Sequence, residues 1–250
     1  MAKIDFSAVE KNLINWLQAK VDSAGAQGAV VGLSGGIDSS VTAGLCQKAF
    51  GDNVLGVIMP CHSGERDEKD AEMLSNKFDI KSIKYDMSEV YDHFLDGLKT
   101  KGVKGGKMAE ANIKPRLRMT ALYYYAASLN YLVIGTDNRS ELKIGYFTKY
   151  GDGGIDLAPL GSLVKSEVKV LAERLDIPES IITKKPSAGL WRGQTDEDEM
   201  GFSYEELDKY ILTGEAEDDV KKEIDKLAEK NRHKLAPIPI PERKDMLSES

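Results

Sequence analysis

Apolar residues follow two different patterns along the chain, and the two patterns alternate. Uninterrupted apolar runs at 29–33, 54–59 and 131–134 are typical of strands buried on both faces, and 80–85 is a further strand candidate. Between and after these runs, apolar residues recur at the three- and four-residue spacing of helices. The predicted helices cover residues 6–21, 38–50, 65–78, 87–100, 108–129, 168–175, 203–212 and 216–231.

Strands that alternate with helices predict an α/β fold, a doubly wound, Rossmann-like parallel sheet flanked by helices. Ligands of such sheets bind at the carboxyl ends of the strands. We expect one domain over residues 1–250, because this length suits a single core and no internal repeat is visible. Residues 102–108 and 183–195 are expected to be mobile loops, residues 236–250 form a C-terminal tail, and prolines are expected to keep residues 236–242 extended.

The composition narrows the class of protein. Hydrophobic residues make up 41% of the chain and charged residues 30%, which excludes disorder of the whole chain. The net charge of −7 argues against a general nucleic-acid-binding role, since that role needs a basic face. No apolar run approaches the ~18 residues of a membrane span, and the N-terminus lacks the apolar core of a secretory signal. Only two cysteines occur, Cys46 and Cys61, and both fit a reducing cytosol, so we expect a cytoplasmic protein. From the net charge and the lack of a long apolar run, we expect neither nucleic-acid nor membrane partners.

Residues 34–40, Ser-Gly-Gly-Ile-Asp-Ser-Ser, lie between a predicted strand and a predicted helix. Glycines let backbone N–H groups converge on an anion, the helix adds its positive end, and the serines add hydroxyl donors. Asp38 would repel a phosphate unless a cation lay between them, which indicates Mg²⁺. The plainer alternative is a glycine turn with an Asp or Ser helix cap, which explains one residue but not the whole group. Neither GxxxxGK[ST] nor GxGxxG occurs in the chain.

This loop resembles the SGGxDS pyrophosphate loop of the ATP pyrophosphatase superfamily, which includes GMP, asparagine, argininosuccinate and NAD synthetases and tRNA thiolases. The loop alone does not choose among them. Further blocks resemble the signature blocks of the NAD synthetases, in the same order and over nearly the whole chain. These blocks are residues 112–119, 135–141, 145–156, 159–161 and 185–197.

The resemblance implies a ligase that forms a C–N bond in the last step of NAD biosynthesis. Deamido-NAD would be amidated by ammonia through an adenylated intermediate, with ATP as co-substrate and Mg²⁺ as cofactor, giving NAD, AMP and pyrophosphate. Ammonia is the expected nitrogen donor, because the match leaves no room for an amidotransferase domain and neither cysteine has a catalytic triad. The family also implies a homodimer with the deamido-NAD site at the subunit interface.

Two other functions stay open. One is another amidating ATP pyrophosphatase, such as the ATPase subunit of a two-chain GMP synthetase, although the blocks at 145–156 and 185–197 argue against it. The other is a non-catalytic ATP-binding module, which the loss of Asp38 or Glu141 would have favoured. Both residues are present.

The resemblance also implies the site residues. Those that would bind ATP are Gly32, Leu33, Ser34, Gly35, Gly36, Ile37, Asp38, Ser39, Thr136, Lys165 and Ser187. Those that would bind deamido-NAD are Arg116, Lys149, Asp156, His233 and Lys234. The metal ligands would be Asp38 and Glu141. The catalytic residues would be Asp38, Lys165, Ser187 and Asp156, and Asp152 would position or deprotonate ammonium.

Plainer roles exist for several of these residues. Glu141 could lie on a solvated helix face, and Arg116 could belong to a basic face of the long predicted helix. Lys165 could be a surface lysine at a helix start, but its charge would oppose the helix dipole there, which favours an anionic partner. His233 and Lys234 alone would be no more than a basic pair after the last predicted helix.

Overall fold

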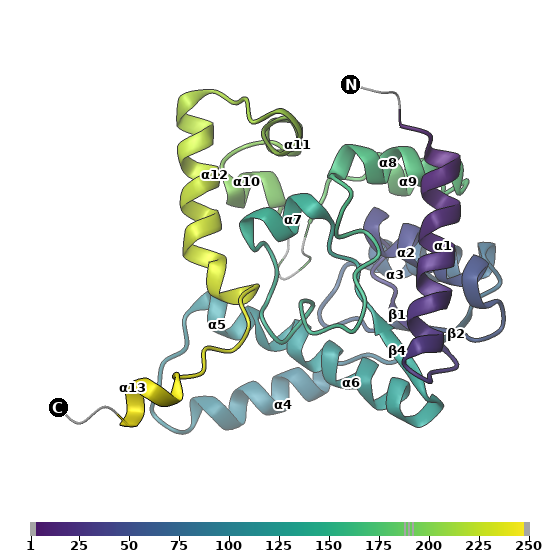
Figure 1. The fold of residues 1–250 in the computed structure, drawn as a ribbon. Coiled ribbons are helices and arrows are strands. Elements are labelled where there is room, and N and C mark those ends of the chain that lie inside the picture. The colour runs from purple at the N-terminus through teal and green to yellow at the C-terminus, as the bar shows by residue number, and fades with distance from the viewer. Residues whose placement is uncertain (1–3, 188, 190, 192, 248–250) are drawn as a thin grey trace.

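The computed structural model describes residues 4–187, 189, 191 and 193–247 and has a parallel four-stranded sheet at its centre (Figure 1). The strands are β1 (Gly28–Gly32), β2 (Val54–Ile58), β3 (Lys81–Lys84) and β4 (Tyr131–Ile134). Their order in the sheet is β3-β2-β1-β4, and Val30 at the centre of β1 pairs with Leu55 and Val133. The predicted α/β fold with a Rossmann-like parallel sheet is confirmed.

Helices cover both faces of the sheet and bury a separate apolar core on each. The first face carries α1 (Phe6–Ser23), α2 (Ile37–Phe50), α3 (Glu65–Lys77), α8 (Lys165–Arg174) and α9 (Glu179–Ile182). The second face carries α4 (Ser88–Lys99) and α6 (Ile113–Leu129). Successive residues of β1 alternate between the two cores, since Val31 packs on the first and Val30 on the second. This burial on both faces explains the uninterrupted apolar run.

A third apolar cluster lies apart from the sheet, within the helices that follow β4. Its elements are α7 (Arg139–Ile144), α10 (Asp196–Met200), α11 (Tyr204–Thr213) and α12 (Asp218–Asn231). Ile144, Leu207 and Ile224 are fully buried among them. Figure 1 shows these helices beside the sheet, with α7 between it and α12. The cluster therefore holds α7, which follows β4 directly, in a fixed position.

One predicted helix differs from the structure. The expected helix over 108–129 is two helices, α5 (Lys107–Ala111) and α6, with Asn112 between them. Pro115 lies in the first turn of α6, where its missing N–H removes no hydrogen bond, so the helix restarts just before it. In the C-terminal tail, residues 236–242 form no helix or strand, as their prolines predict, and α13 (Arg243–Leu247) follows them. No described helix combines the length and the apolar character that crossing a membrane requires.

Candidate active site

A cavity of about 740 Å³ opens at the carboxyl ends of β1 and β2 and beside the turn after β4. The predicted ATP-binding residues that line it are Gly32, Leu33, Ser34, Gly36, Ile37, Asp38, Ser39, Thr136, Lys165 and Ser187. The predicted dinucleotide-binding residues that line it are Arg116, Lys149, His233 and Lys234. Glu141 lines it as well, whereas Gly35 and Asp156 do not. Parallel strands thus bring together residues that lie far apart in the sequence.

The backbone of the phosphate loop (residues 34–40) requires glycine at one position. Gly35 has φ +73°, and a Cβ atom there would lie 2.3 Å from the carbonyl oxygen of Asp67. The hydroxyls of Ser34 and Ser39 are hydrogen-bonded to each other at 2.9 Å across the turn. The N-cap of α2 is Gly36, and no side chain caps the helix. The alternative of an Asp or Ser cap is therefore wrong, and the helix N-terminus faces the cavity without a side-chain partner.

Lys165 joins two carboxylates that come from different helices. Its Nζ donates to Oδ2 of Asp38 at 2.5 Å and to Oε1 of Glu141 at 3.3 Å. The Lys165 side chain is only 3% exposed. Burial lowers the pKa of Lys165, but the negative charges of Asp38 and Glu141 raise it by more than burial lowers it. The pKa of Lys165 is therefore above the ordinary lysine value. Lys165 is therefore protonated and holds α2, α7 and α8 together at the edge of the cavity.

Glu141 is oriented by a capping box at the start of α7. The Asn138 side chain accepts from the backbone N–H of Glu141, and Oε2 of Glu141 accepts from the N–H of Asn138 at 3.0 Å. Oε1 is left to face Lys165 and the hydroxyl of Tyr204, which donates to it at 3.3 Å. Burial raises the pKa of Glu141, and the charge of Lys165 opposes this rise. Glu141 thus belongs to a buried cluster and not to a solvated helix face.

The position of Lys165 at a helix start is explained by a carboxylate from α11. Asp208 is buried, and its two oxygens accept from the backbone N–H groups of Lys165 and Ser166, at 3.3 and 2.7 Å. The hydroxyl of Ser140 donates to the same carboxylate. Asp208 therefore balances the positive end of α8, so that the lysine side chain is free to face Asp38 and Glu141.

The donor set of this corner suits a hard divalent cation. Asp38 and Glu141 direct one carboxylate oxygen each to a common point, now taken by the Lys165 ammonium. Asp137 is buried beside them, and its Oδ2 has no hydrogen-bond partner within the described chain. No larger group of described His, Cys, Asp or Glu side chains has ligating geometry. Two carboxylates plus substrate phosphates are the usual protein setting of Mg²⁺.

Lys184 is a site residue that the sequence analysis missed. Its Nζ donates to the carbonyl oxygen of Gly35 at 3.1 Å and to Oδ2 of Asp70 at 2.8 Å, and it pairs with Asp67 at 2.6 Å. It therefore ties the segment that contains Ser187 to the phosphate loop. The available signal was the pair Lys184–Lys185 just before that serine, but nothing in the sequence showed which carbonyl oxygen it would reach.

The predicted dinucleotide residues gather around the turn after α7. Arg116 donates to the carbonyl oxygen of Lys149 at 3.3 Å, and Lys149 donates to that of His233 at 2.7 Å. Lys234 donates to the carbonyl oxygens of Gly145 and Phe147 at 2.7 and 2.8 Å. Burial lowers the pKa of Lys234. The pair at 233–234 is therefore part of the cavity wall.

Asp156 lies apart from these four residues. Its carboxylate accepts from the hydroxyl of Tyr123 at 3.0 Å and from the backbone N–H of Val133 at 2.8 Å. Asp156 is exposed on the outer side of β4 and does not line the cavity. Within one chain, the structure does not bring it next to Arg116 or Lys149.

The model of the NAD synthase family matches residues 9–238. The chain belongs to this family. An NH3-dependent NAD(+) synthetase of Carboxydothermus hydrogenoformans is 52% identical over 93% of the chain and 96% of the relative, and one of Archaeoglobus fulgidus is 46% identical over 98% of the chain and 100% of the relative. Among solved structures, the NMN synthetase from Francisella tularensis superposes with a TM-score of 0.92 at 38% identity, covering 96% of this chain and 99% of that one.

A second solved relative, the NH3-dependent NAD synthetase from Campylobacter jejuni, has a TM-score of 0.79 and 32% identity. The match covers 96% of this chain and 100% of that one. The match to both structures includes the sheet and the helices after β4. The cavity described above therefore lies within the part that this chain shares with both structures.

We expect Gly35→Ala to abolish tight ATP binding. The new Cβ would collide with the Asp67 backbone, and a positive φ is strained for alanine by about 1–2 kcal/mol, so the phosphate loop must move. Calorimetric titration of ATP should show at least about tenfold weaker binding, which is 1.4 kcal/mol. Gly64→Ala is the matched control, because a Cβ there meets Asp67 only at 3.7 Å. Unchanged ATP affinity in Gly35→Ala would show that the loop does not hold the phosphates.

Proposed function

We propose that this chain catalyses the last step of NAD biosynthesis, the ATP-dependent amidation of deamido-NAD with ammonia. The observation that carries the proposal is a single cavity. It is lined by the phosphate loop, by the cluster of Lys165 with its two carboxylates, and by the basic residues at 116, 149, 233 and 234. The family match over residues 9–238 supports it, as do relatives with the name NH3-dependent NAD(+) synthetase at up to 52% identity. The products would be NAD, AMP and pyrophosphate.

The phosphate loop and the N-terminus of α2 would bind the ATP phosphates, and Thr136 and Ser187 would contact the nucleotide from two further sides of the cavity. Lys165 is protonated and would neutralise phosphate charge as pyrophosphate leaves. Asp38 and Glu141 would hold a magnesium ion, which supplies further neutralisation of the phosphates when bound. The carboxylate of the substrate would then attack the α-phosphorus of ATP, forming an acyl-adenylate and releasing pyrophosphate.

Arg116, Lys149, His233 and Lys234 would hold deamido-NAD with its carboxylate near that phosphorus. Basic side chains suit the pyrophosphate of a dinucleotide. Asp152 lines the same cavity, where its carboxylate would attract and orient ammonium before ammonia displaces AMP. Lys184 would keep the segment around Ser187 close to the phosphate loop, which limits the access of water to the acyl-adenylate.

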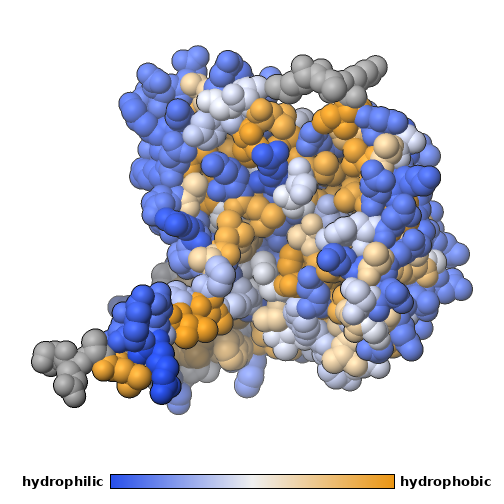
Figure 2. All heavy atoms as spheres, in the orientation of Figure 1, coloured by the Kyte–Doolittle hydropathy of each residue, from blue (hydrophilic) through white to orange (hydrophobic). Residues whose placement is uncertain are grey.

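The chain is also proposed to act as one domain and to form a homodimer. The outer face of α4 exposes Val90, Phe94 and Leu98. The C-terminal arm (residues 236–247) projects from the body in Figure 1 and exposes further apolar residues, and Figure 2 shows apolar side chains gathered where it leaves the body. In a dimer, Asp156 of one chain could complete the dinucleotide site of the other, which would explain its distance from the cavity.

The free thiols of Cys46 and Cys61 support a cytoplasmic location.

The experiment that tests the activity is an endpoint assay with ATP, Mg²⁺, ammonium and deamido-NAD. We expect equal amounts of NAD, AMP and pyrophosphate, all dependent on ammonium. A parallel assay uses nicotinic acid mononucleotide, because a relative with a TM-score of 0.92 is an NMN synthetase. Amidation of the mononucleotide in preference to deamido-NAD would replace the proposed substrate. Absence of ATP cleavage with either acid would contradict the activity itself.

We expect Asp38→Asn to lower kcat at least about a hundredfold, because the amide removes one carboxylate ligand and one partner of Lys165. Asn138 also donates to Asp38, at 2.9 Å, but this contact with a neutral amide does not replace the lost negative charge. The measurement is the rate of pyrophosphate release at saturating substrates. Asp52→Asn is the control, since this exposed residue follows α2 at its far end. Ordinary turnover in Asp38→Asn would remove Asp38 from the proposed mechanism.

For the dimer, light scattering during size-exclusion chromatography should give twice the chain mass of 27.5 kDa. The double variant Phe94→Glu/Leu98→Glu should give a single-chain mass, because four buried charges would face each other across a two-fold interface. Val170→Glu on α8 introduces a charge at another exposed apolar position and should stay dimeric. A monomeric wild type, or a dimeric double variant, would contradict this interface.

A further inference from the structure

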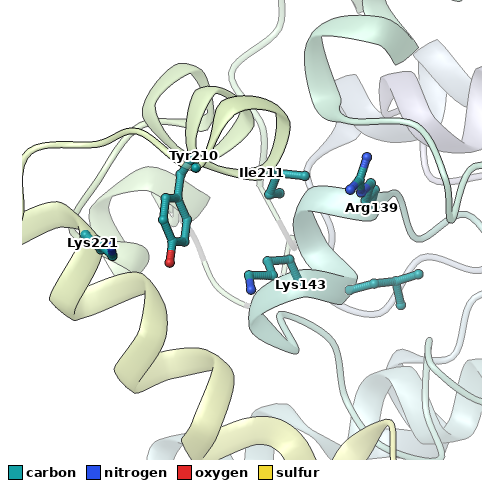
Figure 3. A pocket seen from close by; sticks show the side chains of 7 residues that line it. Arg139, Lys143, Tyr210, Ile211 and Lys221 are labelled. Carbon is teal, nitrogen blue, oxygen red and sulfur yellow. The ribbon is translucent and has the colours of Figure 1, made fainter.

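A second pocket lies between α7, α11 and α12, on the side of α7 away from the phosphate loop. It has a volume of about 640 Å³ and shares no lining residue with the active-site cavity. Its lining residues are Arg139, Leu142, Lys143, Tyr210, Ile211, Gly214 and Lys221. Figure 3 shows Tyr210 reaching from α11 into the space between Lys143 on α7 and Lys221 on α12.

This pocket is basic, although the chain as a whole is acidic. Acidic residues outnumber basic ones, 41 to 34, yet the lining contains three cations and no carboxylate. Arg139, Lys143 and Lys221 form no salt bridge to any described residue. One carboxylate borders the pocket, because Asp225 accepts from the hydroxyl of the lining residue Tyr210 at 2.9 Å, but no ion pair joins it to the three cations.

The cations have only weak partners within the chain. The Nζ atoms of Lys143 and Lys221 lie 5.7 and 5.9 Å from the centre of the Tyr210 ring. Such contacts at exposed sites are weak, and three like charges around one hollow repel one another. A multivalent anion in the hollow would offset this repulsion, and the basic side chains that reach it would donate charge-assisted hydrogen bonds. Leu142 and Ile211 add an apolar wall, which a bare inorganic ion does not need.

We propose that this pocket binds a small phosphorylated metabolite, with its phosphate among Arg139, Lys143 and Lys221 and its organic part against Tyr210 and Ile211. The volume is within the range of small-molecule sites. A ligand there would contact the same short helix, α7, that carries Glu141 on its inner side. The pocket is a site separate from catalysis, so the proposal stands whether or not the proposed reaction is correct.

The test is calorimetric titration of two probes, inorganic phosphate and ribose 5-phosphate, into the full chain. A saturating amount of magnesium α,β-methylene-ATP occupies the phosphate loop beforehand, so that the remaining heat reports on other sites. At about 0.15 M salt we expect ribose 5-phosphate to bind with a dissociation constant below about 1 mM. Tighter binding of ribose 5-phosphate than of inorganic phosphate would show that the organic part of the ligand adds to the affinity, as proposed. Equal binding would contradict the proposed contact between the organic part and the apolar wall.

The variant Lys143→Glu/Lys221→Glu should weaken binding of ribose 5-phosphate at least about tenfold, since two charge-assisted contacts are lost. The matched control is Lys11→Glu/Lys169→Glu, which changes the net charge equally at exposed helix positions on α1 and α8. Lys143→Gln/Lys221→Gln should give an intermediate loss, and a thermal melt checks that each variant is folded. The proposal is overturned if the wild type binds neither probe, or if the control weakens binding as much as the pocket variant.

Discussion

The site depends on one buried ammonium group between two carboxylates. Without Lys165, the side chains of Asp38 and Glu141 would bring two negative charges into a poorly solvated corner, where they would repel each other. The lysine can reach them because Asp208 balances the end of α8. The strands, the helical cluster after β4 and the phosphate loop are thereby fixed relative to one another at a single point. A structure that lacked this contact would still have its sheet, but its cavity would lose a common anchor.

The spacing of apolar residues along the sequence predicted the strands and most of the helices. The three apolar runs became β1, β2 and β4 because both faces of the parallel sheet are covered, and the weaker candidate became β3, one of the two edge strands. The capping box at Asn138 fixes Glu141, and the glycine at 35 meets a steric limit that a short motif can encode. The family resemblance supplied the roles of residues such as Lys149, which no spacing argument could have assigned.

The remaining features depend on contacts between distant segments. Lys184 and Asp208 act on residues that lie far from them in the sequence, and their own surroundings look like ordinary helix and loop. The position of Asp156 outside the cavity follows from its bond to the Val133 backbone, a contact made by a returning chain. The break between α5 and α6 shows the same limit on a smaller scale, since the apolar spacing continued across Asn112. Single-sequence reasoning predicts which residues are chemically capable, but tertiary packing decides which ones meet.

The contact of Lys184 with the Gly35 carbonyl oxygen bears on how fast and how tightly a nucleotide can be captured. A loop that must become ordered around a ligand loses conformational entropy at the moment of association, and this loss subtracts from the affinity. Here the lysine and its two aspartate partners order the loop when the chain folds. The receptor is preorganised, so encounter with a nucleotide needs desolvation and alignment but no search among loop conformations. Variation in the α3 surface around Asp67 and Asp70 is accordingly a route by which related sequences could tune nucleotide affinity without changing a residue that contacts the nucleotide.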